Sequence, residues 1–318
     1  MSDLPKSITI QEVGPREGFQ MEGAPINTEN KIRLIDALSQ SGLQWIEVTS
    51  FVSPKWVPQM ADAEQVVRGI ERRPGVRYTG LFLNLQGLER ARATGKLDIS
   101  GVIRVTVSDL HSRRNTNKGL EETIAELPKW FEFARQHELP LREVGFLTAF
   151  GCYFQGDIPL ELLLDVMKKV MKLSEDHGVK YERIRLTDSV GWANPVQIRR
   201  TIAAVRERWP EPTLCLHVHD TRGMGLPNCL AAMEMGVSVF DTSVGGLGGC
   251  PFAAHRGASG NVCTEDLVLM CQEMGVDTGV DLNKIIECGR LAEEIVGHAL
   301  PGKVMKGGPL PHGGGDSH

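Results

Sequence analysis

The chain has 318 residues, of which 41% are hydrophobic, 24% charged and 6% aromatic, and its formal net charge is -5. This composition excludes a disordered or fibrous protein and suffices for one sizeable core. The acidic balance gives no reason to expect nucleic acid as a partner, and no apolar run approaches the roughly 20 residues that cross a membrane.

The cysteines and the amino terminus indicate the compartment. There are seven cysteines, an odd number, and none of them forms a CxxC pair, which favours reduced thiols over a disulfide framework. The segment 1–7 is short and polar and resembles neither a signal peptide nor a transit peptide. Both observations predict a cytoplasmic protein.

Along the chain, short β-branched apolar runs alternate with segments of helical periodicity. The apolar runs predict eight strands, near residues 8–13, 45–51, 76–83, 101–107, 141–149, 182–187, 213–218 and 237–242. The segments between them predict helices, for example over 30–41, 61–72, 120–138, 159–177, 195–208 and 225–235.

Strand–helix alternation implies parallel pairing, and eight such units predict an α/β fold of the closed (β/α)8 TIM-barrel type. An open doubly wound sheet is the second interpretation, but no GxGxxG follows the first strand. Two further helices, near 264–275 and 281–299, are expected to pack on the barrel. We therefore expect a single barrel domain over 1–300 and a flexible tail over 301–318.

Polar side chains gather where the predicted strands end, which is where barrel active sites lie. A single aspartate or serine there is equally explained as a helix cap, as for Asp109 and Ser189. Helix capping does not explain the whole set of polar residues at the strand ends. Its members are Arg16, Glu17, Gln20, Glu47, Ser50, Ser108, Asn115, Asp188, His217 and His219.

The most specific motif is His217-Val218-His219, because strand residues two apart face the same side. Two imidazoles form half of a metal site, although a hydrogen-bonded histidine pair is the alternative. Glu17 and Asn261 are candidates to supply oxygen ligands. We favour Mg²⁺ or Mn²⁺, while the ligand types do not exclude Zn²⁺.

A glycine-rich loop over 245–261 follows the last strand and fits no P-loop pattern. It suits a lid that closes over substrate. Cys250 stands at its middle, and taken alone this cysteine is more typical of an inert thiol than of a catalytic one.

Several stretches together carry a family resemblance over about residues 7–300. They are EVGPREGFQME, IEVTSFVSPKWVPQMAD, LTDSVGWANP, LHVHDTRGMGLPN, SVGGLGGCPFA and GASGNVCTEDL. On these motifs the chain resembles the 3-hydroxy-3-methylglutaryl-CoA lyase family. The HxHDTxGxGLxN run is shared with isopropylmalate and homocitrate synthases, whereas SFVSPKWVPQMAD and GGLGGCP are closer to the lyases.

The resemblance implies an acyl-CoA substrate, cleavage to acetyl-CoA and acetoacetate, a divalent cation and a homodimer. It places the catalytic arginine on Arg16 and a loop cysteine on Cys250. The site residues that it implies besides these are the metal ligands Glu17, His217, His219 and Asn261 and the carboxylates Glu47, Asp188 and Glu265.

Two departures from the family pattern bear on the substrate. The family reads PRDGLQ where this chain reads PREGFQ, so Glu17 takes the place of an aspartate ligand. The segment 254–256 adds about two residues between Cys250 and Asn261. An altered loop would place Cys250 differently or accept another acyl group.

The hypothesis for the chemistry is a retro-Claisen cleavage. The base that takes the 3-hydroxyl proton is His217, Asp188 or a coupled pair of the two, and Arg16 stabilises the enolate oxygen. Cys250, or a water that it orders, protonates the carbanion carbon. Glu265 orients ligands or relays protons or, alternatively, is a helix-start carboxylate. Gln20, Ser50, Ser108 and Asn115 are the remaining rim residues that we expect to contact substrate.

Two other enzyme classes stay open. One is a lyase for a related thioester such as citramalyl-CoA, and the other, more remote, is an isopropylmalate-synthase-type acyltransferase. The residues that hold the CoA phosphates are not evident from the sequence: Arg113 and Arg114 are candidates, but their pattern favours solvated surface charges.

Overall fold

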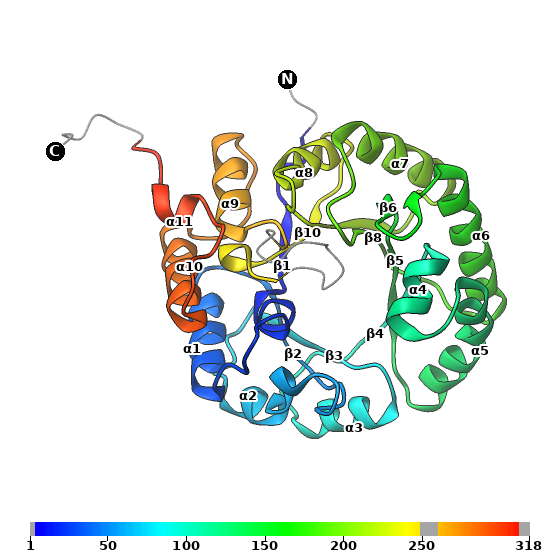
Figure 1. Ribbon diagram of the computed structural model, residues 1–318, viewed down its shortest axis with the longest axis horizontal. Helices are drawn as coiled ribbons and strands as arrows, with labels where there is room; N and C mark the ends of the chain where they lie inside the picture. Colours follow the sequence, from blue (N-terminus) through cyan, green and yellow to red (C-terminus); the bar gives the residue numbers. More distant parts are fainter. Residues whose placement is uncertain (1–3, 249–259, 312–318) are drawn as a thin grey trace.

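The computed structural model describes residues 4–248 and 260–311. Eight parallel strands form one sheet in the order β3-β2-β1-β10-β9-β8-β5-β4, and Figure 1 shows them rolled into a ring surrounded by helices. The two strands at the ends of this order, β3 and β4, are neighbours in the ring. The backbone N–H of Asp98, just before β4, donates to Tyr78 of β3 at 2.7 Å. The predicted (β/α)8 barrel is confirmed.

All eight predicted strands are present, with ends that differ by three residues or fewer. They are β1 (Thr9–Glu12), β2 (Trp45–Ser50), β3 (Arg77–Leu81), β4 (Gly101–Thr106), β5 (Leu141–Leu147), β8 (Arg183–Asp188), β9 (Thr213–Val218) and β10 (Val239–Thr242). A small antiparallel hairpin, β6 (Gly151–Cys152) and β7 (Gly156–Asp157), follows β5 and was not predicted.

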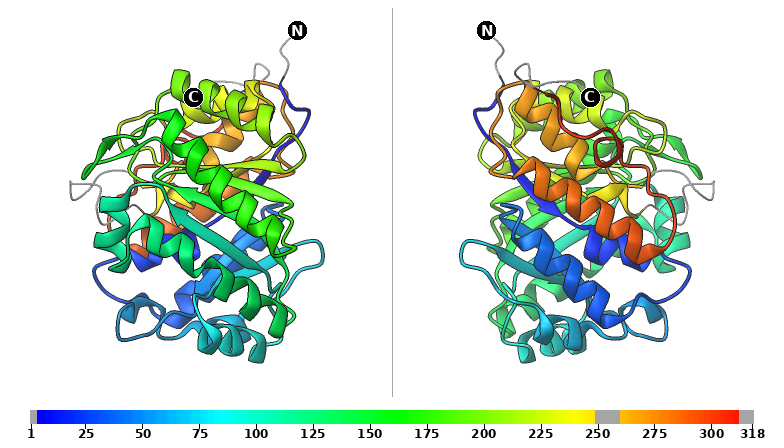
Figure 2. Two further views of the ribbon diagram at one scale, coloured as in Figure 1. Left: turned by 90° about the vertical axis from the view of Figure 1, so that its right-hand side faces the viewer. Right: turned by 90° about the vertical axis from the view of Figure 1, so that its left-hand side faces the viewer.

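The helices cover the outside of the ring (Figures 1 and 2). Those that the periodicity predicts are α1 (Thr28–Ser39), α2 (Ala63–Gly69), α5 (Leu120–Gln136), α6 (Leu160–Asp176), α7 (Pro195–Arg208) and α8 (Gly225–Glu234). Two more, α3 (Leu85–Ala93) and α4 (Asp109–Thr116), were not predicted. Two short helical turns complete this part of the barrel, η1 (Gly14–Gly18) and η2 (Pro58–Met60).

The predicted carboxy-terminal helices are α9 (Thr264–Glu273) and α10 (Leu282–Val296), and Figure 2 shows α10 lying along α1. A short helix, α11 (Val304–Gly307), follows; Val304 and Met305 are buried, and Asp266 accepts from the Val304 N–H at 2.7 Å. The domain division at residue 300 stays a prediction, but the segment that contains α11 packs on the barrel. In the part of the chain that the structure describes, no helix has both the length and the apolar character to span a membrane.

The strands are almost fully buried, as expected for a parallel sheet that helices cover. Alternate side chains point outward, where Ile46, Val144 and Ile184 pack against the helices. The inward positions are different in this chain, because they carry charged side chains along much of the strand length. The barrel interior is therefore a polar cavity.

Candidate active site

Arg16 and Glu17 lie on η1, a π-helical turn that directly follows β1 at the carboxyl end of the barrel. Pro15 occupies the start of the turn, where its missing N–H costs no hydrogen bond. Single π-helical turns often mark functional sites because they re-aim side chains. Here the turn is held close to the chain after β10, since a Cβ on Gly18 would come within 2.7 Å of Leu247.

The two histidines are placed by β9. His217 is the fifth residue of the strand, and His219 follows its end. The chain after the undescribed loop returns beside them, because Asp220 donates its N–H to Gly260 and His219 forms an isolated bridge with Asn261. This pairing brings Asn261 next to His219, even though Asn261 lies 41 positions after Asp220 in the sequence.

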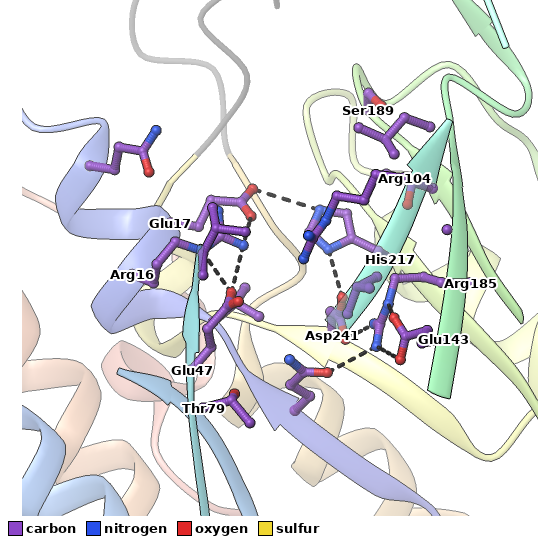
Figure 3. Close-up of a pocket in the computed structure, with 18 of the residues that line it drawn as sticks. Arg16, Glu17, Glu47, Thr79, Arg104, Glu143, Arg185, Ser189, His217 and Asp241 are labelled. Atoms are coloured by element: carbon purple, nitrogen blue, oxygen red, sulfur yellow. Dashed lines mark hydrogen bonds and ion pairs between the residues drawn. The ribbon is translucent and has the colours of Figure 1, made fainter. Parts of the chain in front are cut away.

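The side chains of Glu17, His217 and His219 converge on one point, and Figure 3 shows Glu17 and His217 facing each other. The nearest ligand atoms of the three residues all lie within 4.8 Å of one another. Nε2 of His217 is 3.1 Å from Nε2 of His219, and Oε1 of Glu17 is 3.4 Å from the latter atom. Oδ1 of Asn261 is buried and has no hydrogen-bond partner among the residues that the structure describes, and its Nδ2 is 3.2 Å from Glu17 Oε1. This gathering of lone pairs fits a divalent metal ion.

The charges around Glu17 keep its carboxylate ionised. Burial alone would raise the pKa of Glu17, but His217 and Arg16 beside it hold that pKa well below its ordinary value. An ionised carboxylate is the form that binds a metal.

His217 is oriented from behind by Asp241 on the adjacent strand β10, where the two residues are paired in register. Its Nδ1 lies 2.9 Å from Asp241 Oδ2, so a proton on Nδ1 leaves Nε2 free as a ligand atom. The other oxygen of Asp241 accepts from Arg185, whose Nε donates to Glu143 at 2.6 Å. The orientation of His217 thus depends on a chain of buried ion pairs inside the barrel.

Arg16 is fixed by Glu47 of β2. Its Nε donates to Glu47 Oε2 at 2.7 Å, and its Nη2 lies 2.6 Å from the same oxygen and 3.1 Å from Glu17. Arg16 and Glu47 therefore form a rigid pair on one side of the candidate metal centre, as Figure 3 shows.

A cavity of about 380 Å³ opens over this centre and continues into the barrel. Of the residues predicted to lie at the site, the following line it: Arg16, Glu17, Gln20, Glu47, Asn115, His217 and His219. Ser50 and Ser108 are buried and do not line it. Ser108 instead caps α4, since its hydroxyl accepts from the His111 N–H at 3.2 Å.

Two predicted carboxylates also lie outside the cavity lining. Both oxygens of Asp188 accept backbone N–H groups, from Trp192 and Ala193, each at 2.8 Å. Glu265 accepts from the Gly245 N–H at 3.1 Å, and burial raises its pKa to about 7. Both side chains therefore support turns next to the site, and neither faces the cavity.

The predicted loop cysteine, Cys250, lies outside the described residues. The role that the resemblance implies for it stays a prediction. The six cysteines within the described part are buried and free of disulfides.

The charged residues inside the barrel were not predicted from the sequence. Arg104, Glu143, Arg185 and Asp241 all line the cavity, and each stands at an inward position of its strand. A signal was present in the sequence, because IRVTV and RIRLT place arginines within otherwise apolar runs. An arginine in a buried strand needs a partner or a cavity.

A (β/α)8 barrel that gathers one carboxylate, two imidazoles and an amide at its carboxyl end defines a class of barrel proteins with a candidate divalent-metal centre. Comparison with known proteins gives the particular group. The chain belongs to the HMGL-like family, whose model matches residues 7–292.

Two curated relatives are similar over nearly their whole lengths. The hydroxymethylglutaryl-CoA lyase YngG of Bacillus subtilis is 41% identical over 305 residues, covering 95% of this chain and 97% of the relative. The mitochondrial hydroxymethylglutaryl-CoA lyase of Gallus gallus is 44% identical over 287 residues, covering 90% and 92%.

Among solved structures, a similar chain is an HMG-CoA lyase from Acinetobacter baumannii in complex with coenzyme A and 3-methylmalate. It superposes with a TM-score of 0.86 at 37% identity, and the match covers 100% of both chains.

Proposed function

We propose that this protein is a hydroxymethylglutaryl-CoA lyase, a carbon–carbon lyase that cleaves 3-hydroxy-3-methylglutaryl-CoA to acetyl-CoA and acetoacetate. The observation that carries the proposal is the convergence of Glu17, His217, His219 and the unpartnered Asn261 Oδ1 beside Arg16. The full-length similarity to lyases of this name supports it.

The proposed metal ligands are Glu17, His217, His219 and Asn261. These residues would hold a divalent ion, which would make the substrate 3-hydroxyl more acidic and orient it. Mg²⁺ or Mn²⁺ suits the carboxylate and amide oxygens, while the two imidazoles keep Zn²⁺ among the metals to be tested.

In the proposed reaction, a base removes the proton of the 3-hydroxyl. The O–H electrons form the new ketone as the C2–C3 bond breaks, and the electrons of that bond pass to the thioester as an enolate. The proposed base is His217 or Asp188. His217 lines the cavity but can accept the proton only when its Nε2 does not bind the metal, because Nδ1 donates to Asp241; both Asp188 oxygens accept backbone N–H groups.

Arg16 stabilises the enolate oxygen in this proposal. Its guanidinium stays charged and keeps donors free beyond those that bind Glu47 and Glu17. Protonation of the enolate carbon completes acetyl-CoA. We propose Cys250 as the donor of that proton, as the family resemblance implies.

A coupled assay for acetoacetate tests the proposal. Metal-loaded enzyme is expected to release acetoacetate from 3-hydroxy-3-methylglutaryl-CoA, and chelated enzyme is not. Citramalyl-CoA and the CoA thioester of 3-methylmalate belong in the same panel, since the Acinetobacter lyase structure holds 3-methylmalate. Folded, metal-loaded protein that cleaves only one of these other thioesters would refute the proposed substrate while keeping the reaction class.

Three finer proposals accompany this function. We propose a homodimer, which light scattering of the purified protein tests, and a cytoplasmic location, which fractionation tests. The third concerns the CoA moiety, which we expect to lie at the carboxyl-end rim near Asn115, a cavity-lining residue.

A further inference from the structure

Among the residues that the structure describes, four arginines and four carboxylates line the cavity, and all but one of them have a partner of opposite charge. Arg16 pairs with Glu47 and Glu17. Arg183 and Arg185 share Glu143, and Arg185 also binds Asp241. Arg104 is the exception: no hydrogen bond or ion pair joins it to any residue in 4–248 or 260–311.

Arg104 stands in the cavity itself. It is the one exposed residue of β4, although β4 is a strand of the barrel wall. Its charged neighbours are Glu47, Arg16, Glu143 and Arg185, so the surface that it exposes faces the cavity and not the outside of the protein. Figure 3 shows the side chain reaching from β4 to the middle of the site, toward His217, without a dashed line to any neighbour.

The unpaired guanidinium is exposed to the cavity and stands among other charged side chains. Desolvation and the positive charges of Arg16 and Arg185 lower the pKa of Arg104. The negative charges of Glu47 and Glu143 raise it, but the net shift of the pKa is downward. Those two carboxylates are already engaged by other arginines. Because the guanidinium is exposed to the cavity, an anion that enters the cavity can supply the missing partner.

The space beside Arg104 is kept open by a glycine. Gly145 of β5 is its partner in the strand register, and the nearest heavy atom to a Cβ built there is 3.8 Å away. Gly145 thus places no side chain between Arg104 and Arg185, with which it is paired on either side, and this favours room for a small anionic group next to the guanidinium.

We propose that Arg104 binds the free carboxylate of the acyl group and thereby selects CoA thioesters of short hydroxy dicarboxylic acids. This inference rests on the proposed lyase function. A planar guanidinium matches a carboxylate through two parallel N–H···O bonds. The anion is the acyl carboxylate and not a phosphate of CoA, because the pantetheine arm holds the phosphates far from the reacting acyl end.

The test compares Arg104→Met with the wild type on two ligands, 3-hydroxy-3-methylglutaryl-CoA and its neutral terminal amide. The wild type is expected to show a kcat/KM for the carboxylate that is about 100-fold or more above that for the amide. In Arg104→Met this preference disappears, because the carboxylate thioester loses its ion pair with Arg104 and the neutral amide had no such ion pair to lose. Arg104→Lys restores part of it, and Arg200→Met on the exposed surface of α7 serves as the matched control.

Two results would overturn the proposal. One is an Arg104→Met enzyme that keeps the wild-type preference for the carboxylate. The other is an equal loss of kcat on both ligands, which would place Arg104 at the enolate instead. Thermal melting separates misfolding from either result: removing an unpaired cation should leave the Tm of the ligand-free protein unchanged or higher, and a clear fall would mean a structural role and contradict the proposal.

Calorimetric binding of the same two thioesters separates this inference from the lyase function. If the wild type cleaves neither thioester, the proposed function fails, but a carboxylate preference in binding that Arg104→Met removes would still support the anion site. Equal binding of both thioesters to the wild type would overturn the anion site whatever the turnover.

Discussion

Asp241 decides which nitrogen of His217 can face a metal. Its Oδ2 lies 2.9 Å from His217 Nδ1, while Oδ1 accepts from Arg185. In Asp241→Asn the amide oxygen stays with Arg185, so the amide N–H₂ faces Nδ1 and forces the imidazole proton onto Nε2. We expect Mn²⁺ affinity to fall about 10- to 100-fold.

Titration of apo-protein with Mn²⁺, followed by electron paramagnetic resonance, measures this effect without turnover. Asp165→Asn on the exposed face of α6 is the matched control. An Asp241→Asn protein that binds Mn²⁺ as the wild type does would show that Asp241 plays no part in orienting His217.

Arg16 should affect turnover far more than metal binding. Arg16→Met removes the donor that we assign to the enolate oxygen, and the expected loss of kcat is at least about 100-fold. The metal stoichiometry should stay intact, because the substitution removes the ion pair between Arg16 and Glu17 and leaves the Glu17 carboxylate available to the metal. Steady-state kinetics with metal analysis of the same sample tests both statements, and near-normal kcat would refute the enolate role.

At the scale of single residues, the sequence predicted that Glu17, His217 and His219 lie together at the strand ends, but it did not predict the side chains that hold them in place. The HxH spacing places His217 and His219 together because strand geometry leaves little choice. Asp188 and Glu265 were harder, since a carboxylate after a strand or at a helix start serves a pocket or a turn equally well. Only the backbone path shows that both bind backbone N–H groups.

Among the elements, the chain after β10 is tied to the carboxy-terminal helices by buried acids. Glu265 of α9 binds the Gly245 N–H, and Glu12 binds the N–H groups of Gly14 and Val244. Burial raises the pKa of each of these two glutamates to about 7. Both are therefore predominantly protonated in the folded protein at mildly acidic pH.

This shift predicts a pH dependence of stability. Because the folded-state pKa of Glu265 lies above the ordinary value of 4.5, the native state binds more protons than the unfolded state between about pH 4.5 and 7. The free energy of unfolding should therefore fall as pH rises through that window. In Glu265→Gln the fall should be smaller, and Glu12 should account for what remains.

Urea denaturation at a series of pH values measures the slope. The matched control is Glu161→Gln, an exposed glutamate in the first turn of α6. A Glu265→Gln protein with the wild-type slope would mean that Glu265 is ionised in the fold across this range.

The elements missed from the sequence are those without an apolar stripe. The helix α4, DLHSRRNT, buries only His111 and Ser112, and α3 contains Gly87 and buries little beyond Leu88 and Ala91. Both are stabilised by their caps, Ser108 and Asn84, and by the barrel that they cover. Periodicity detects a helix through its buried face, so short polar helices of this kind escape it.

For the whole molecule, the candidate metal centre joins three distant parts of the chain: η1 after β1, the end of β9, and the segment at Asn261. A metal that binds only the folded state should raise its stability, by about 2.7 kcal/mol when the free ion is at 100 times its dissociation constant. Melting curves with Mn²⁺ and with chelator test this, and His219→Ala should lose the metal-dependent rise in Tm. The account fails here if His219→Ala is stabilised by Mn²⁺ as strongly as the wild type.

The barrel as a whole was predictable because each strand–helix unit repeats the same alternation of apolar run and amphipathic segment. What the sequence did not reveal is that the interior is polar. Charged residues such as Glu143 and Arg185 are paired across neighbouring strands, and pairing across strands depends on register, which one sequence leaves undetermined. The polar interior matters for function, because it leaves a cavity at the place where packed apolar side chains fill the interior of other barrels.

The central claim is that the Glu17, His217 and His219 centre supports carbon–carbon cleavage. The most direct measurement is ¹³C NMR of labelled 3-hydroxy-3-methylglutaryl-CoA incubated with the metal-loaded wild type, the chelated wild type and metal-treated Glu17→Ala. The account predicts that signals of acetoacetate and acetyl-CoA appear with the metal-loaded wild type alone. Equal product formation by the chelated wild type or by Glu17→Ala would contradict it.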